Sequence, residues 1–133
     1  MLGRLQDVHV LLVDDHDDLR ELVSMTLTRE GARVTEADSV RAAVTVIARG
    51  QISLLLSDIG MPGDDGYDLI RRVRASELLG RSRKTPAVAV TGFSGVRTKA
   101  LAMGYQECLP KPLDHAQLVD VVERLAQPVL RLE

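Results

Sequence analysis

The chain has 133 residues, of which 45% are hydrophobic and 27% are charged. This length and balance predict one folded domain with a real core and exclude a largely disordered chain. The 17 basic and 19 acidic side chains leave a net charge of -2, so no strong field draws this domain to nucleic acid or to anionic lipid.

The N-terminal residues, the apolar runs and the cysteine content indicate where in the cell the protein is located. The first seven residues, MLGRLQD, lack the apolar core of a signal peptide, and no apolar run approaches the roughly 20 residues that cross a bilayer. The single cysteine, Cys108, cannot form an internal disulfide, which suits a reducing compartment. We therefore expect a soluble, cytoplasmic protein with no membrane segment.

The first apolar run, residues 8–13, is short and rich in valine, and it ends at an acidic cluster. This pattern is typical of a buried strand that ends at a polar edge. From Leu19 the apolar residues return at helical spacing, and Gly31 provides a C-terminal stop. A strand followed by a helix is the first expected unit.

The same alternation continues to the end of the chain. The other expected strands span residues 33–37, 52–56, 87–90 and about 107–109. The other expected helices run from a Ser39 cap to Gly50, through 69–73 to about 78, from 96 to 103, and across 118–125. Strands too apolar to be exposed on either face, alternating with helices, predict a doubly wound α/β domain with a five-stranded parallel sheet.

Polar side chains stand at the carboxyl ends of the expected strands, the edge where such sheets bind ligands. They are Asp14 and Asp15 after the first strand, Asp58 after the third, Thr91 after the fourth and Lys111 after the fifth. Three carboxylates in one place repel one another unless a cation lies among them. Because Mg²⁺ takes carboxylate and phosphate oxygens, we expect a phosphoryl-binding magnesium site here.

A carboxylate can itself be the nucleophile and form an aspartyl phosphate. Asp58 is the best candidate because it stands alone on the central strand, whereas the adjacent Asp14 and Asp15 suit a shared metal. Lys111 can pair with the phosphoryl charge and the Thr91 hydroxyl can donate to a phosphoryl oxygen. Taken singly, these residues are a helix cap, a turn residue or a surface lysine, so the prediction depends on their joint arrangement.

Four segments resemble the receiver domain of two-component response regulators over about residues 8–126. They are LLVDDHDDLR at 11–20, LLLSDIGMPGDDGYDLI at 54–70, AVTG at 89–92 and LPKPL at 109–113. The resemblance implies a flavodoxin-like (βα)5 fold with strand order 2-1-3-4-5. It also implies one receiver domain over 1–133, with short tails and too few residues after 126 for a DNA-binding output domain.

The resemblance assigns a role to each candidate residue. Asp58 is the implied phosphoacceptor, and Thr91 and Lys111 are the implied contacts of the phosphoryl group. The implied magnesium ligands, with Mn²⁺ as a possible substitute, are Asp14, Asp15, Asp58 and the backbone carbonyl of Gly60. A cis peptide bond between Lys111 and Pro112 is implied as well, and it is chemically plausible because X-Pro bonds pay a small cis penalty.

The resemblance also implies partners. The phosphodonor would be a phosphohistidine on a histidine kinase or a histidine phosphotransfer protein. Phosphorylation would change contacts with an unknown downstream protein, so the domain would be a switch in a phosphorelay rather than a turnover enzyme. The sequence fits both a stand-alone regulator and one domain of a longer hybrid kinase or regulator.

Two positions depart from the family pattern. The residue three before Lys111 is usually aromatic or histidine and serves as a switch, but here it is Cys108, which has no ring to swing. We interpret Cys108 as a small core residue rather than a redox sensor. In the tight connection at 91–101 we expect Phe93 to overhang the site, while Gly60 leaves space over the acyl phosphate and so influences the access of water.

Two other functions are conceivable. A magnesium-dependent phosphohydrolase would share Asp58 and the metal, but it needs a second acid to activate water and a cap for its substrate. A flavodoxin-like cofactor binder needs a Gly-rich or Ser/Thr-rich loop after the first strand, where this chain has acids.

Three groups of residues receive structural interpretations. We expect packing roles for Tyr67 and Tyr105, and no catalytic or metal role for the scattered His9, His16 and His115, of which His16 lies beside the acidic cluster. A basic run has no interleaved aromatic residues and is interpreted as a solvated face; it comprises Arg71, Arg72, Arg74, Arg81, Arg83 and Lys84.

Overall fold

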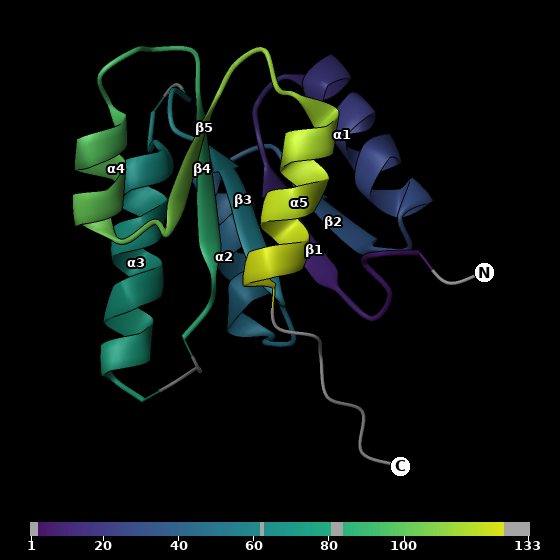
Figure 1. Cartoon of the computed structure of the whole chain (residues 1–133). Helices are drawn as coiled ribbons and strands as arrows, with labels where there is room; N and C mark the ends of the chain where they lie inside the picture. The colour runs from purple at the N-terminus through teal and green to yellow at the C-terminus, as the bar shows by residue number, and fades with distance from the viewer. Residues whose placement is uncertain (1–2, 62, 81–83, 127–133) are drawn as a thin grey trace.

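A computed structural model describes residues 3–61, 63–80 and 84–126, in which strands and helices alternate along the chain (Figure 1). The strands are β1 (His9–Val13), β2 (Arg33–Ala37), β3 (Leu54–Asp58), β4 (Ala87–Thr91) and β5 (Glu107–Pro110). The helices are α1 (Asp17–Arg29), α2 (Val40–Ala48), α3 (Gly66–Leu78), α4 (Arg97–Met103) and α5 (His115–Leu125). Across these ranges, none of the helices has the length and apolar character needed to span a membrane.

The strands form one parallel sheet in the order β2-β1-β3-β4-β5, which confirms the expected fold and strand order. Residues alternate along each strand, so Leu11 and Leu55 face one layer of helices while Leu12 and Leu56 face the other. The first layer comprises α2, α3 and α4, and the second comprises α1 and α5 (Figure 1). The order in which the strands were added to the sheet reverses between β1 and β3. The carboxyl ends of these two strands are therefore the place where such folds bind ligands.

One strand differs from its predicted bounds by more than one residue at an end, and another differs in burial. β3 covers Leu54–Asp58 rather than 52–56, because the polar Ser57 and Asp58 are buried and continue the pairing with β4 opposite Ala89 and Val90. The expectation that every strand is buried on both faces is wrong for β2. That strand lies at the sheet edge, where Arg33 and Glu36 are exposed.

The helix starts are set by local capping. The Ser39 side chain accepts a hydrogen bond from the backbone N–H of Ala42, as expected for a cap of α2. Asp65 caps α3 through a reciprocal capping box with Asp68. α1 begins at Asp17, two residues before the first apolar position, because acidic side chains are favourable in the first turn of a helix.

The basic run is only partly a solvated face. Arg71 and Arg72 are exposed and pair with acidic neighbours. Arg74 is half-buried and donates to backbone carbonyls in the loops before β4 and β5, so it holds those loops against α3. Arg81 and Arg83 lie outside the described residues, as do the tail residues 127–133. The expected cis bond between Lys111 and Pro112 is present.

Candidate functional site

Acidic side chains from β1 and β3 meet at the carboxyl edge of the sheet. Asp14 and Asp15 follow β1, and Asp58 is the last residue of β3. One ligand atom from each of them and one from His16 lie within 4.8 Å of one another. Asp58 is 4% exposed and Asp14 is 7% exposed, so their mutual repulsion is weakly screened by water. The predicted convergence of three carboxylates is confirmed.

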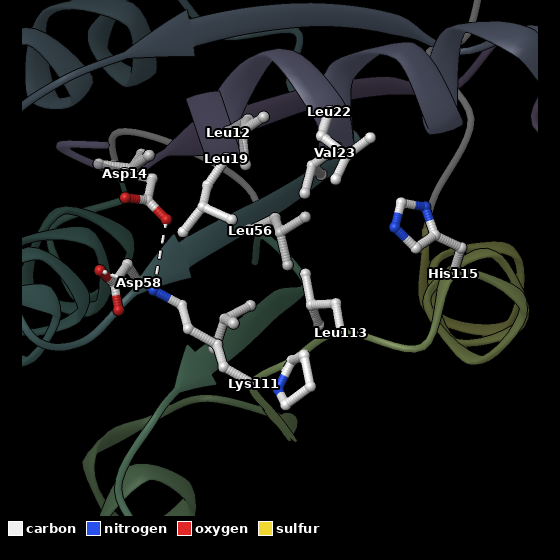
Figure 2. Close-up of a pocket in the computed structure, with 13 residues that line it drawn as sticks. Leu12, Asp14, Leu19, Leu22, Val23, Leu56, Asp58, Lys111, Leu113 and His115 are labelled. Atoms are coloured by element: carbon white, nitrogen blue, oxygen red, sulfur yellow. Dashed lines mark ion pairs between the residues drawn. The ribbon is translucent and has the colours of Figure 1, made fainter. Parts of the chain in front are cut away.

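Lys111 brings a positive charge to this cluster. Its Nζ atom lies 3.3 Å from Asp58 Oδ2 and 3.6 Å from Asp14 Oδ2, and Figure 2 shows the side chain extending toward both carboxylates. The backbone N–H of Lys111 donates to the carbonyl oxygen of Thr91, which anchors the lysine beside β4. One lysine cannot balance three carboxylates, so the site retains a net negative charge.

One carboxylate oxygen in the cluster is unsatisfied. Asp15 Oδ1 is buried and has no hydrogen-bond partner among the described residues. The His16 ring nitrogen lies 3.2 Å away, but it does not meet hydrogen-bond geometry and the ring is largely exposed. A buried carboxylate oxygen without a donor is costly, and a hard divalent cation such as Mg²⁺ would satisfy it. The donor set therefore fits the expected metal.

The helix-cap interpretation of the acidic pair is not supported. The N-cap residue of α1 is His16, which makes no side-chain cap bond. Asp14 Oδ1 instead accepts from the backbone N–H of His16 at 2.8 Å, and Asp58 Oδ1 accepts from that of Gly60 at 3.2 Å. These bonds hold Oδ1 of each carboxylate within its own loop, while Oδ2 of each faces Lys111.

Thr91 ends β4 beside Asp58. The strand register puts Asp58 opposite Val90, so Thr91 stands one residue further along the same edge. The buried Thr91 accepts at Oγ1 from the backbone N–H of Phe93 at 3.0 Å. Because this bond uses the oxygen as an acceptor, the hydroxyl can still donate to a ligand.

Cys108 lies in the core beneath α4 and not in the acidic cluster. It is 7% exposed and packs with the core that includes Ala100 and Tyr105. Burial raises the pKa of its thiol, which disfavours the reactive thiolate. The interpretation as a core residue therefore agrees with its surroundings. Tyr105 also packs as expected, and its hydroxyl donates to the Gly66 carbonyl oxygen at 2.7 Å.

The sequence did not predict a cavity of about 530 Å³ beside the cluster. Leucine and valine side chains line most of it, and Asp14, Asp58 and Lys111 stand at one end (Figure 2). His115 lines it as well and is hydrogen-bonded to Thr26, which joins α5 to α1. The sequence signal for this cavity is the pair of apolar residues Leu19 and Leu22 in the first turns of α1, which line the cavity and remain exposed.

Comparison with known proteins identifies the family of this protein. Residues 10–123 match the family model of the response regulator receiver domain, and the chain belongs to this family. It is therefore a phosphoryl-accepting signalling domain of two-component systems, a family whose partners include histidine kinases and whose members bind Mg²⁺ at an acidic cluster.

Individual relatives differ in length. The chain is 37% identical over 122 residues to an uncharacterized 14.6 kDa protein of Leptolyngbya boryana, and this match covers 90% of the chain and 91% of that protein. It is 37% identical to the response regulator protein FleR of Pseudomonas aeruginosa over 88% of the chain, but this match covers only 24% of FleR. A solved putative response regulator from Chloroflexus aurantiacus shares 29% identity, with a TM-score of 0.81 over 89% of this chain and 96% of that one.

Proposed function

We propose that Asp58 is the phosphoacceptor of this receiver domain and that the chain forms a single domain over residues 1–133. The observation that carries the proposal is the contact of Asp58 with Lys111 inside the buried acidic cluster, because a nucleophilic carboxylate there has a cation within 3.3 Å. The position of Asp58 on the central strand, at the edge where such sheets bind ligands, supports the same role.

Asp14, Asp15, Asp58 and the backbone carbonyl of Gly60 are the proposed magnesium ligands, with Mn²⁺ as a substitute. The unsatisfied Asp15 Oδ1 and the 4.8 Å cluster support this set. When bound, the ion supplies positive charge that stabilises the oxygens of the phosphoryl group.

Asp58, Lys111 and Thr91 have separate roles in phosphoryl transfer. A carboxylate oxygen of Asp58 bonds to phosphorus while the bond from phosphorus to the donor's histidine nitrogen breaks, and the imidazole leaves with the bonding electron pair. Lys111 pairs with the phosphoryl charge, and the Thr91 hydroxyl donates to a phosphoryl oxygen. The domain thus acts as a switch rather than as a turnover enzyme, and its phosphorylated form contacts a downstream protein.

The phosphodonor is a histidine kinase or a histidine phosphotransfer protein, and we propose that it docks on α1 beside the cavity. The cavity reaches Asp58, and Leu19, Leu22 and Met25 present apolar surface along α1. An approach from this side brings a phosphohistidine to the carboxylate without rearrangement of the sheet. The family's kinase partners and the single, unpaired Cys108 support a cytoplasmic location.

The test is incubation with acetyl phosphate and Mg²⁺, followed by intact-mass measurement of wild type, Asp58→Asn and the exposed control Asp38→Asn. Wild type and Asp38→Asn should gain one labile phosphoryl group, and Asp58→Asn should gain none. Excess chelator should prevent the gain. A wild type left unmodified by both acetyl phosphate and phosphoramidate would refute the proposal, and turnover of many donor equivalents would instead favour a phosphohydrolase.

A further inference from the structure

A groove separate from the acidic cluster lies between α2 and α3, in the layer of helices on the opposite side of the sheet from α1 and α5 (Figure 1). Its volume is about 570 Å³. The side chains that define this α2–α3 groove come from both helices; they are Val44, Ile47, Arg49, Arg72, Val73 and Ser76. Among the described residues, none that lines the α2–α3 groove also lines the cavity beside Asp58. The phosphoryl chemistry proposed for Asp58 therefore leaves this groove without a role.

The most buried side chains of the α2–α3 groove are apolar. Val73 is 2% exposed, and Val44 and Ile47 are partly buried against the same core. Leu79 lies one helical turn beyond Ser76, at the C-cap of α3, and it is 69% exposed. Residues one turn apart share a side of a helix, so Leu79 extends the apolar surface at one end of the groove. Recessed apolar surface of this kind receives the apolar side chains of a partner helix.

The sides of the α2–α3 groove carry unbalanced positive charge. Arg49 lines the groove, Arg41 lies one turn before Val44 on the same side of α2, and both arginines are exposed. Neither arginine pairs with a carboxylate among the residues that the structure describes. The arginines of α3 on this side are balanced by acidic neighbours; the pairs are Arg71 with Asp68 and Arg72 with Asp64. Arg41 and Arg49 therefore leave excess positive charge beside the groove, on a chain whose net charge is -2.

The charge and the shape of the α2–α3 groove disfavour two other occupants. The same face of a second copy would bring positive charge against positive charge, which repels. A flat bilayer surface does not reach Val44 and Ile47, because both are recessed against the core. A helix fits both properties, since its apolar side chains project into a groove while charged residues on its flanks reach the sides.

We propose that the α2–α3 groove binds an acidic amphipathic helix of a partner protein. Apolar side chains of that helix enter the groove between α2 and α3, and its carboxylates meet Arg41 and Arg49. The groove is distinct from α1, the proposed docking helix of the phosphodonor, so the partner helix can stay bound while Asp58 is phosphorylated. The inference does not depend on the proposed function of Asp58.

A pair of designed peptides tests the proposal. The probe is a fluorescein-labelled helix with leucines at positions i, i+3, i+4 and i+7 and with glutamates on both flanks, and the matched peptide has lysine in place of every glutamate. Fluorescence anisotropy measures the affinity of each peptide for the whole chain. The acidic peptide should bind roughly tenfold more tightly than the basic peptide, and this difference should shrink as the salt concentration is raised.

Variants of the chain locate the binding site. Arg49→Glu should weaken binding of the acidic peptide by roughly threefold to tenfold, and Leu79→Ala by roughly twofold to fivefold. The matched control Arg29→Glu changes an exposed arginine at the end of α1 and should keep the wild-type affinity. No binding of the acidic peptide, equal binding of both peptides, or an equal loss in Arg29→Glu would overturn the proposal. Displacement of the peptide by phosphatidylglycerol vesicles would also overturn it, because the surface would then be a membrane site.

Discussion

Neutralising Asp58 should make the metal-free protein more stable. Asp58→Asn keeps the shape of the side chain and the acceptor for the Gly60 N–H, but it removes one charge from the acidic cluster. Two effects then oppose each other. Repulsion from Asp14 and Asp15 is lost, and so is the attraction to Lys111.

The distances decide which effect is larger. At an effective dielectric constant of about 20, unit charges 4.8 Å apart interact by about 3.5 kcal/mol and charges 3.3 Å apart by about 5 kcal/mol. The two repulsions together exceed the single attraction by about 2 kcal/mol. Because 4.8 Å is the upper limit of the separations in the cluster, we expect Asp58→Asn to raise the free energy of unfolding by about this amount or more.

The assay is urea unfolding in excess EDTA for wild type, Asp58→Asn and the control Asp38→Asn, a substitution at an exposed position. The control should stay within about 0.5 kcal/mol of wild type. Mg²⁺ at 100 times its dissociation constant should add about 2.7 kcal/mol to the wild type and less to Asp58→Asn at the same concentration. An Asp58→Asn protein that is no more stable than wild type in EDTA would refute the electrostatic reasoning.

Two further predictions concern buried titratable groups. Burial lowers the pKa of His9, so the folded protein favours the neutral imidazole. The stability that the neutral imidazole contributes is present above a pH of about 6.5, the ordinary pKa of histidine, and it is lost as the pH falls below this value. Between pH 7.5 and 5.5 the free energy of unfolding should fall less steeply for His9→Gln than for wild type, by up to about 1.4 kcal/mol per pH unit. The same slope in both proteins would contradict this cause. Because burial raises the pKa of the Cys108 thiol, iodoacetamide at pH 8 should label it slowly in the native protein and fully in urea; rapid native labelling would show that the thiol is accessible.

The element order and the site followed from the sequence because both depend on local patterns. Short apolar runs and helical spacing identified the strands and helices, and a parallel sheet brings the carboxyl ends of its strands to one edge. That single rule grouped Asp14, Asp15, Asp58, Thr91 and Lys111, although they are spread over most of the chain. Element limits were less accurate, since strand pairing and not hydrophobicity carries β3 on to Asp58.

Features that depend on contacts between distant segments required the tertiary structure. The exposed face of β2 comes from its place at the sheet edge, and the cavity beside Asp58 lies between α1 and the loop that joins β5 to α5. The Phe93 ring meets Gly60 only because β3 and β4 are neighbours and their loops turn toward each other. The sequence by itself determined which side chains gather at the sheet edge, because strand direction decides that. Only packing in three dimensions decided their distances and the shape of the cavity beside Asp58.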